Sequence, residues 1–370
     1  MHSTFKTARA TCTTLSLMGK SSIKTSHEHV LIINSAEGNN VSFHEYGHSA
    51  LWNAGPMNRR ANGSAVFTPT AGGMADAGLL YALSSFNDTK NNRRVLYGWA
   101  EEDITGDGGI FSAKQQGFQG SLSLPRELFV HEVPGVLNVN GSLTELGPNW
   151  VVQQSNLTFT AYTLGQRPLQ DVVEGLRNGT TQHSFAGRTY NSTTMLVSNA
   201  SSHAEIKATI SSATGAAGLR IAASPNGTEY TTIYYEPSNN TVVVDRSHSS
   251  LLGEQFNNAS NIGYFLPYTT QTEYGKPVQE ALEWDIFIDG SLIEVYLNDR
   301  FALTTRIYPA MESSTGFGVY VAQGASATVK SLDYWGDLYN VWPQRPLNSS
   351  SQLVWDTPAE TDNYIWWTGN

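Results

Sequence analysis

The chain contains a single cysteine, Cys12, so no disulfide can form within its 370 residues and its stability must come from packing. Charge is also scarce, because Asp, Glu, Lys and Arg together make up 15% of the residues. The balance is acidic, with 32 carboxylates against 22 Lys and Arg and a net charge of −10. Such a chain repels phosphate backbones and anionic lipid surfaces. We therefore expect neither a nucleic acid nor a membrane among its partners.

Long hydrophobic runs are missing as well. No stretch approaches the roughly 18 apolar residues of a membrane span, and the first twenty residues lack the continuous apolar run of about seven that a signal peptide requires. Acceptors for N-glycosylation are nevertheless frequent, which favours an extracellular or secretory location. This conflict suggests an incomplete N-terminus, and we expect residues 1–40 to be poorly defined. The acceptors are Asn40, Asn62, Asn87, Asn140, Asn156, Asn178, Asn191, Asn199, Asn226, Asn239, Asn258 and Asn348.

Helical periodicity is nearly absent from the sequence. Apolar residues alternate with polar ones or form short β-branched and aromatic runs, which predicts an all-β fold with one short helix at residues 168–177 (PLQDVVEGLR). The length favours two folding units. Pro, Gly and Asn residues between Glu127 and Trp150 predict the boundary. The expected organisation is an N-terminal segment at 1–40, a first domain at 41–135, a β-sandwich at 150–340 and a tail at 341–370.

One hairpin can be predicted in detail. In residues 284–298 (WDIFIDGSLIEVYLN), the pair Asp289-Gly290 lies between two alternating runs and suits a type I′ turn. The acidic residues around this hairpin are interpreted as structural, with Glu294 pairing with Arg306. Successive side chains of a strand point to opposite faces. The two expected faces of the second strand are Ile293, Val295 and Leu297, and Leu292, Glu294 and Tyr296.

Four segments, taken in order and spacing, resemble glycoside hydrolase family 32, the family of the fungal-type β-fructofuranosidases, invertases and fructosyltransferases. Each segment alone is weak, because Gly-Trp or Asp-Gly-Ser pairs are common. Together they resemble the C-terminal part of such a protein. The segments are residues 76–86 (DAGLLYALSSF), 93–99 (RRVLYGW), 116–128 (QGFQGSLSLPREL), and 289–298 (DGSLIEVYLN) with 304–309 (TTRIYP).

The resemblance implies a five-bladed β-propeller followed by a β-sandwich, of which this chain would hold the last blade or blades and the whole sandwich. Retaining cleavage of a fructoside needs two carboxyls about 5 Å apart. In the family these groups lie in Asn-Asp-Pro-Asn-Gly, Arg-Asp-Pro and Glu-x-Cys segments, and none of these strings occurs here. If the segment around Cys12 corresponds to the last of them, Ala10 occupies the glutamate position. No catalytic residue is therefore assigned.

The resemblance also implies one substrate-binding residue, Asp76, and Trp99 is a second candidate from the chemistry of its ring. The residue that matches Asp76 reaches the substrate pocket in relatives and hydrogen-bonds sugar hydroxyls, a task suited to a carboxylate. The alternative for Asp76 is a turn residue before Gly78. Trp99 is suited to stack on a sugar face. The alternative for Trp99 is core packing of a propeller strand.

Two further groups of polar residues have structural interpretations. The spacing of His44, Glu45 and His48 is reminiscent of a metal site, but a strand or loop does not place both imidazoles on one helical face. Residues 101–109 (EEDITGDGG) resemble the start of a calcium loop without its terminal Glu, so a solvated acidic loop is expected. We assign no metal and no cofactor.

The sequence thus predicts a family 32-like protein of carbohydrate metabolism that acts on β-fructofuranosyl units of sucrose or fructans and is inactive alone. The alternative is a non-catalytic carbohydrate-binding protein or partner subunit that uses the β-sandwich. The expected partners are a sucrose- or fructan-type carbohydrate and either a second copy of the chain or a full-length homologue bound through the sandwich.

Overall fold

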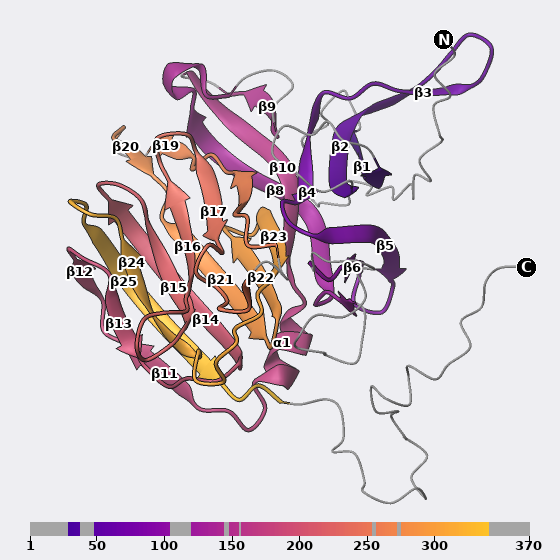
Figure 1. Cartoon of the computed structure of the whole chain (residues 1–370). Coiled ribbons are helices and arrows are strands. Elements are labelled where there is room, and N and C mark those ends of the chain that lie inside the picture. The colour runs from indigo at the N-terminus through magenta and orange to yellow at the C-terminus, as the bar shows by residue number, and fades with distance from the viewer. Residues whose placement is uncertain are drawn as a thin grey trace, which may run out of the picture.

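The computed structural model describes residues 29–37, 48–103, 120–143, 148–154, 157–253, 257–271 and 275–339. These residues are almost entirely β-structure, as the sequence predicts, and all strand pairs are antiparallel. A β-sandwich occupies one side of the molecule, and β1 to β6 lie on the other, with the long strands β8 and β10 between them (Figure 1). Among the described residues, no helix has the length and apolar character needed to cross a membrane.

The sandwich consists of two stacked antiparallel sheets of seven and six strands. The seven-stranded sheet comprises β11 (Gln182–Phe185), β12 (Arg188–Tyr190), β14 (His203–Ala213), β21 (Leu282–Asp289), β22 (Leu292–Leu297), β23 (Phe301–Arg306) and β25 (Ala327–Gly336). The six-stranded sheet comprises β13 (Thr194–Val197), β15 (Ala217–Ala223), β16 (Thr231–Glu236), β17 (Thr241–Asp245), β18 (Asn261–Tyr264) and β24 (Gly316–Val321).

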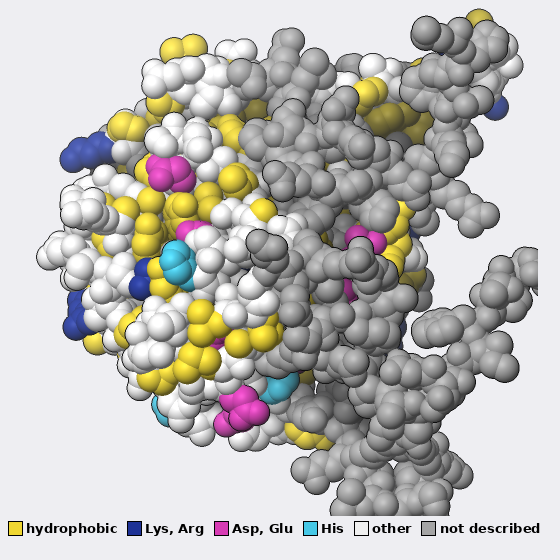
Figure 2. Space-filling view, viewed as in Figure 1, with side chains coloured by type: hydrophobic (Ala, Val, Ile, Leu, Met, Phe, Trp, Pro, Cys, Tyr) yellow, Lys and Arg dark blue, Asp and Glu magenta, His cyan; other side chains and the backbone are white. Residues whose placement is uncertain are grey.

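The main hydrophobic core lies between these two sheets. Ile206 and Val295 from the larger sheet pack with Leu219 and Val244 from the smaller one, and all four are fully buried. Every second side chain of a strand points to the same face, so the inward-facing apolar side chains of the two sheets form this core. On the face shown in Figure 2, charged side chains over the sandwich are few and lie apart, separated by hydrophobic and neutral polar atoms.

The other strands form two further antiparallel sheets of four and eight strands. The four-stranded sheet comprises β1 (His29–Glu37), β2 (His48–Arg59), β3 (Ala65–Phe67) and β4 (Ala71–Asp76). The eight-stranded sheet comprises β5 (Leu80–Asp88), β6 (Arg93–Ala100), β7 (Ser121–Leu122), β8 (Arg126–Leu137), β9 (Trp150–Gln153), β10 (Thr158–Pro168), β19 (Thr269–Gln271) and β20 (Pro277–Gln279). A short 3₁₀ turn, η1 (Val139–Gly141), follows β8.

Strand pairing continues across the predicted domain boundary. β8 lies largely before residues 135–150 and β10 lies after them, yet the two strands pair along most of their length. The chain then forms its one described helix, α1 (Gln170–Leu176), where the sequence predicts it. The helix ends before Gly179, whose φ of +84° suits glycine. The division of the chain into domains at residues 135–150 remains a prediction.

The predicted hairpin is present as β21 and β22. Its turn differs from the prediction, because Asp289 is the last residue of β21 and pairs with Leu292. Of the two loop residues, Gly290 alone has a positive φ, at +58°, which is the pattern of a type II′ turn and not of type I′. The predicted faces are confirmed, since Val295 packs in the sandwich core while Glu294 points to the other side.

Strands β22 and β23 are buried on both faces, and every residue in them is inaccessible or nearly so. Their inner face contributes to the sandwich core. The outer face of β23 contacts β4, β5 and β10 of the other two sheets, and Leu292 on the outer face of β22 packs in the hydrophobic cluster of those sheets. This second contact explains why polar residues of β22 and β23 are buried, and it is where the family-like segments meet.

Candidate functional site

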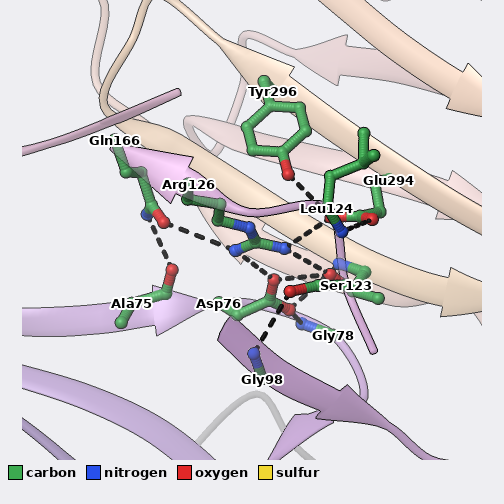
Figure 3. A network of polar contacts seen from close by, with 11 residues as sticks. Ala75, Asp76, Gly78, Gly98, Ser123, Leu124, Arg126, Gln166, Glu294 and Tyr296 are labelled. Atoms are coloured by element: carbon green, nitrogen blue, oxygen red, sulfur yellow. Dashed lines mark hydrogen bonds and ion pairs between the residues drawn. The ribbon is translucent and has the colours of Figure 1, made fainter. Parts of the chain in front are cut away.

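A cluster of polar side chains lies between the sandwich and the preceding strands (Figure 3). Asp76 ends β4, Arg126 begins β8, Glu294 lies in β22 and Thr304 lies in β23. These four residues are at most 1% exposed. We call these four residues, with Gln166 and Tyr296, the buried ionic cluster. It brings together three of the four segments that carry the family resemblance.

Arg126 is the centre of the cluster. Its Nη1 donates to Asp76 Oδ2 at 2.9 Å, and its Nη2 donates to Glu294 Oε2 at 3.0 Å. Nη2 also donates to Thr304 Oγ1 at 2.7 Å. One guanidinium therefore joins a carboxylate from each side of the interface. The planar fork of five donors makes arginine suited to such a bridge.

Asp76 has no oxygen free for a further partner of similar strength. Its Oδ1 accepts from the backbone N–H of Gly78 at 2.8 Å and of Thr304 at 3.0 Å. Its Oδ2 accepts from Arg126 and from the Thr304 hydroxyl at 2.7 Å. Four donors around one buried carboxylate compensate the loss of its hydration.

Tyr296 and Gln166 complete the buried ionic cluster. The Tyr296 hydroxyl donates to Glu294 Oε2 at 2.6 Å, and burial raises the pKa of Tyr296 far above its usual range, so the phenol keeps its proton. The other Glu294 oxygen, Oε1, accepts from the backbone N–H of Leu124 at 2.7 Å. Gln166 Nε2 donates to the carbonyl of Ala75 at 2.7 Å. The cluster is thus tied to backbone on both sides.

A second group of ion pairs extends the same interface. Arg306 Nη2 lies 3.1 Å from Glu102 Oε1, and Arg246 Nη1 lies 2.6 Å from Asp103 Oδ2. The Tyr308 hydroxyl donates to Glu102 Oε2 at 2.6 Å. Glu102 and Asp103 are almost inaccessible, so the predicted solvated acidic loop is wrong at these two positions. The remainder of that segment, residues 104–119, lies outside the described residues.

The predicted pairing of Glu294 with Arg306 is also wrong. Across the β22–β23 ladder, Glu294 lies opposite Thr304 and Arg306 lies opposite Leu292. Arg306 instead donates to the carbonyl of Ala100. Neighbouring positions on two paired strands are not enough to predict an ion pair when partners from a third strand are available.

The two predicted substrate-binding residues lie in different surroundings. Asp76 is fully buried in the cluster, whereas Trp99 on β6 is 39% exposed. Gly120 packs directly against the Trp99 ring, where an added Cβ would lie 2.1 Å from its Nε1. The carboxylate of Asp76 faces the sandwich and is not open to a sugar in this geometry. Substrate binding by either residue remains a prediction.

The other motifs of the sequence cannot be placed. Ala10, Cys12, His44 and Glu45 lie outside the described residues, as does the side chain of His48. Within the described parts of the chain, no group of three or more His, Cys, Asp or Glu side chains could hold a metal ion.

Arg126, Gln166 and Arg246 were not identified from the sequence as residues of a site. Arg126 lies in the third family-like segment, and it is also the first charge after a long neutral stretch, in residues 115–126 (QQGFQGSLSLPR). Arg246 and Gln166 carry no comparable signal. Their partners lie 143 residues away for Arg246 and 91 residues away for Gln166. Chemically, the interface can hold two parts of the chain together, and its described residues present no accessible pair of carboxylates to a sugar.

A separate pair of carboxyl groups lies on the outer face of the seven-stranded sheet. Asp285 accepts from Lys207 Nζ at 2.9 Å, and nearby Glu205 accepts from Nε and Nη2 of Arg177. Arg177 also stacks on Trp335, 3.8 Å from the ring centroid. Burial and then the neighbouring Glu205 charge raise the pKa of Asp285 from 3.8 to about 7.

This raised pKa predicts a pH-dependent stability. Between about pH 4 and 7 the folded protein retains a proton on Asp285 that the unfolded chain releases. The stabilisation of the folded state by this proton is therefore fully present below about pH 4 and is lost as the pH rises to about 7. Asp285→Asn removes the titration. We expect the stability of the variant relative to the wild type to increase between pH 4 and 7, measured by urea unfolding. Parallel profiles for the two proteins would contradict this assignment.

Comparison of the sequence with family models identifies two domains of one family in this chain. The model of the glycosyl hydrolases family 32 N-terminal domain matches residues 2–139, and the model of the family 32 C-terminal domain matches residues 172–336. The first match includes the segment around Ala10 and Cys12. A levanase of Bacillus subtilis is 31% identical over 210 residues, which are 54% of this chain and 29% of the levanase.

Further relatives and solved structures support the same family. A β-fructofuranosidase, insoluble isoenzyme, of Arabidopsis thaliana is 24% identical over 70% of this chain and 44% of its own length. The fructosyltransferase of A. japonicus superposes with a TM-score of 0.76 at 26% identity, covering 86% of this chain and 55% of that one. A β-fructofuranosidase of Aspergillus kawachii gives a TM-score of 0.74 at 26% identity, over 86% and 56%.

These comparisons confirm the predicted fold class. The structural relatives combine a β-propeller with a β-sandwich, and the described strands correspond to part of the former and to the latter. The chain spans less than half the length of these two curated relatives and slightly more than half of the two structures. On the two family matches and the shared fold, the chain belongs to glycosyl hydrolase family 32.

Proposed function

We propose that this protein acts in carbohydrate metabolism on β-fructofuranosyl units of sucrose or fructans, and that the chain by itself does not cleave them. The proposed action on fructosyl units is supported by the three family-like segments that meet in the buried ionic cluster (Figure 3). It is also supported by relatives named levanase, β-fructofuranosidase and fructosyltransferase. These relatives match 54% to 86% of this chain, which supports a common architecture around a common class of substrate.

The second part follows from the chemistry of the available carboxylates. Retaining glycosidases need a nucleophile and an acid about 5 Å apart, both in contact with the sugar. Asp76 and Glu294 are brought near each other by Arg126, but both are buried and their oxygens are occupied by donors. The family's catalytic strings are absent from the sequence. Without such groups, the transition-state charge has no partner.

The test is a fructose-release assay with sucrose, 1-kestose and levan, using the purified chain and a full-length β-fructofuranosidase as positive control. We expect no release above the buffer blank. Turnover that persists through purification and disappears in Asp76→Asn, with folding of the variant verified by circular dichroism, would overturn the proposal. It would also assign Asp76 to the substrate site.

We further propose that the protein is an extracellular glycoprotein. Two curated relatives are named as an insoluble and a cell wall isozyme. All nine acceptor asparagines within the described residues are exposed, as glycan attachment requires. A shift in electrophoretic mobility on deglycosylation of the secreted protein tests this. The nine are Asn62, Asn87, Asn140, Asn178, Asn191, Asn199, Asn226, Asn239 and Asn258.

The second candidate function is non-catalytic: the β-sandwich binds a carbohydrate or a partner protein. The two sheets of the sandwich pack against each other over a fully buried core, so this module has the internal packing of a stable binding unit. Association with a full-length homologue would appear as co-elution in size-exclusion chromatography. Elution of the two proteins at their separate volumes would argue against a partner subunit.

A further inference from the structure

A pocket of about 350 Å³ opens where the end of β8 and the turn η1 meet the edge of the sandwich. Its volume lies within the range of roughly 300–1,000 Å³ that is typical of small-molecule sites. It is separate from the buried ionic cluster, with which it shares no residue. The lining comes from residues 136–143 on one side and from Tyr264, residues 266–269 and Gln279 on the other, together with Asn240.

The lining of this pocket is electrically neutral. None of the thirteen residues that form it is Asp, Glu, Lys, Arg or His. An ionised ligand that entered would lose hydration without gaining an opposite charge, which is costly. The pocket therefore selects for an uncharged molecule.

Several polar side chains of the pocket are available to a ligand. Among the described residues, the side chains of Asn140, Ser142, Thr269 and Gln279 make no hydrogen bond. Two are amides and two are hydroxyls, so the set can donate and accept at the same time. A ligand with many hydroxyl groups, each of which is also donor and acceptor, matches this set.

The pocket also has an aromatic and apolar part. Tyr264, the last residue of β18, is 44% exposed, although it is a large aromatic side chain. Val136 and Leu143 form a buried apolar floor. A tyrosine ring packs well against the C–H face of a sugar ring while its hydroxyl stays hydrated. Hydroxyl-rich edges and an apolar face together are the chemistry of a carbohydrate.

The walls are held in place before any ligand binds. Asn140 and Asn240 adopt left-handed backbone conformations, with φ of +53° and +56°, which asparagine tolerates better than most residues. Asn138 Oδ1 accepts from the backbone N–H of Leu143 at 2.9 Å, and Asn240 Oδ1 accepts from the Tyr235 hydroxyl at 2.7 Å. Such preorganisation lowers the entropy cost of binding.

We propose that this pocket binds one neutral sugar unit. The unit comes either from a soluble oligosaccharide or from the chain's own glycan, because Asn140 and Ser142 are the first and third residues of an acceptor triplet. The proposal locates the sugar site that the second candidate function requires. It is independent of fructoside cleavage, because binding is measured without turnover.

The test is isothermal titration of the full chain with 1-kestose and with mannotriose, using protein made both in a bacterial host and in a glycosylating host. We expect saturable binding by the unglycosylated protein that weakens at least tenfold in Tyr264→Ala. Gln279→Ala should weaken it in the same direction. The matched control is Tyr339→Ala, because Tyr339 is also exposed, at 55%, and lies outside the pocket. This control should bind like the wild type.

The two hosts distinguish the sources of the sugar. If the chain's own glycan occupies the pocket, glycosylated protein fails to bind added sugar until enzymatic deglycosylation removes that glycan, which leaves the pocket side chains unchanged. If the ligand is a soluble oligosaccharide, glycosylated and unglycosylated proteins both bind it. Absence of saturable binding in the unglycosylated protein, or equal binding by wild type and Tyr264→Ala, would overturn the proposal. Equal or tighter binding of the anionic trigalacturonate would do the same.

Discussion

Arg126→Met should lower the free energy of unfolding by about 3–5 kcal/mol, the usual cost of removing one partner from a buried ion pair. The substitution leaves Asp76 and Glu294 as two negative charges in the interior, without the guanidinium that joins them. The measurement is equilibrium unfolding in urea, followed by tryptophan fluorescence. Because the two carboxylates come from opposite sides of the interface, the loss should also loosen the contact between β4 and β23.

The matched control for this experiment is Arg167→Met. Arg167 also bridges two carboxylates, those of Glu127 at 3.0 Å and Asp299 at 3.4 Å, but its side chain is 46% exposed. Exposed pairs contribute less than about 1 kcal/mol. A loss at Arg126 no larger than the loss at Arg167 would show that the buried ionic cluster does not hold the interface. Adding Asp76→Asn to Arg126→Met should restore part of the loss, since the pair is coupled.

Gly78→Ala should lower the free energy of unfolding by about 3 kcal/mol or more, at the upper end of overpacking effects. A Cβ at this position would lie 1.7 Å from the carbonyl oxygen of Thr304. The clash is with backbone, which cannot rotate away as a side-chain end could. Moving Thr304 would also break the hydrogen bonds that Asp76 accepts from it. The thermal midpoint and urea unfolding both report this change.

Gly175→Ala should raise the free energy of unfolding and serves as the control for Gly78→Ala. Gly175 lies in α1, and an added Cβ would have no heavy atom within 4 Å. In a helix, alanine is more stable than glycine by roughly 0.5–1 kcal/mol. The two substitutions should therefore change stability in opposite directions. Equal effects would mean that the close approach of Gly78 to β23 is absent in solution.

Local pattern was sufficient to predict much of this molecule. The alternation in residues 284–298 predicted which side chains of β22 face the sandwich core, and α1 forms where its short pattern predicts it. These features depend on residues close in sequence, through the two-residue period of a strand and the restricted backbone of turns. The exact turn type was less predictable, because Asp-Gly is compatible with more than one pairing register.

The sequence by itself determined the all-β class, the hairpin of β21 and β22 and the family to which the segments belong. Only the tertiary structure decided that Asp76 faces the sandwich, that Glu294 pairs with Arg126 and that Glu102 and Asp103 are buried. The physical reason is distance along the chain. The arginine partner lies 50 residues away for Asp76, 143 for Asp103 and 168 for Glu294. Which charges meet therefore depends on how two sheets pack, not on the alternation within either sheet.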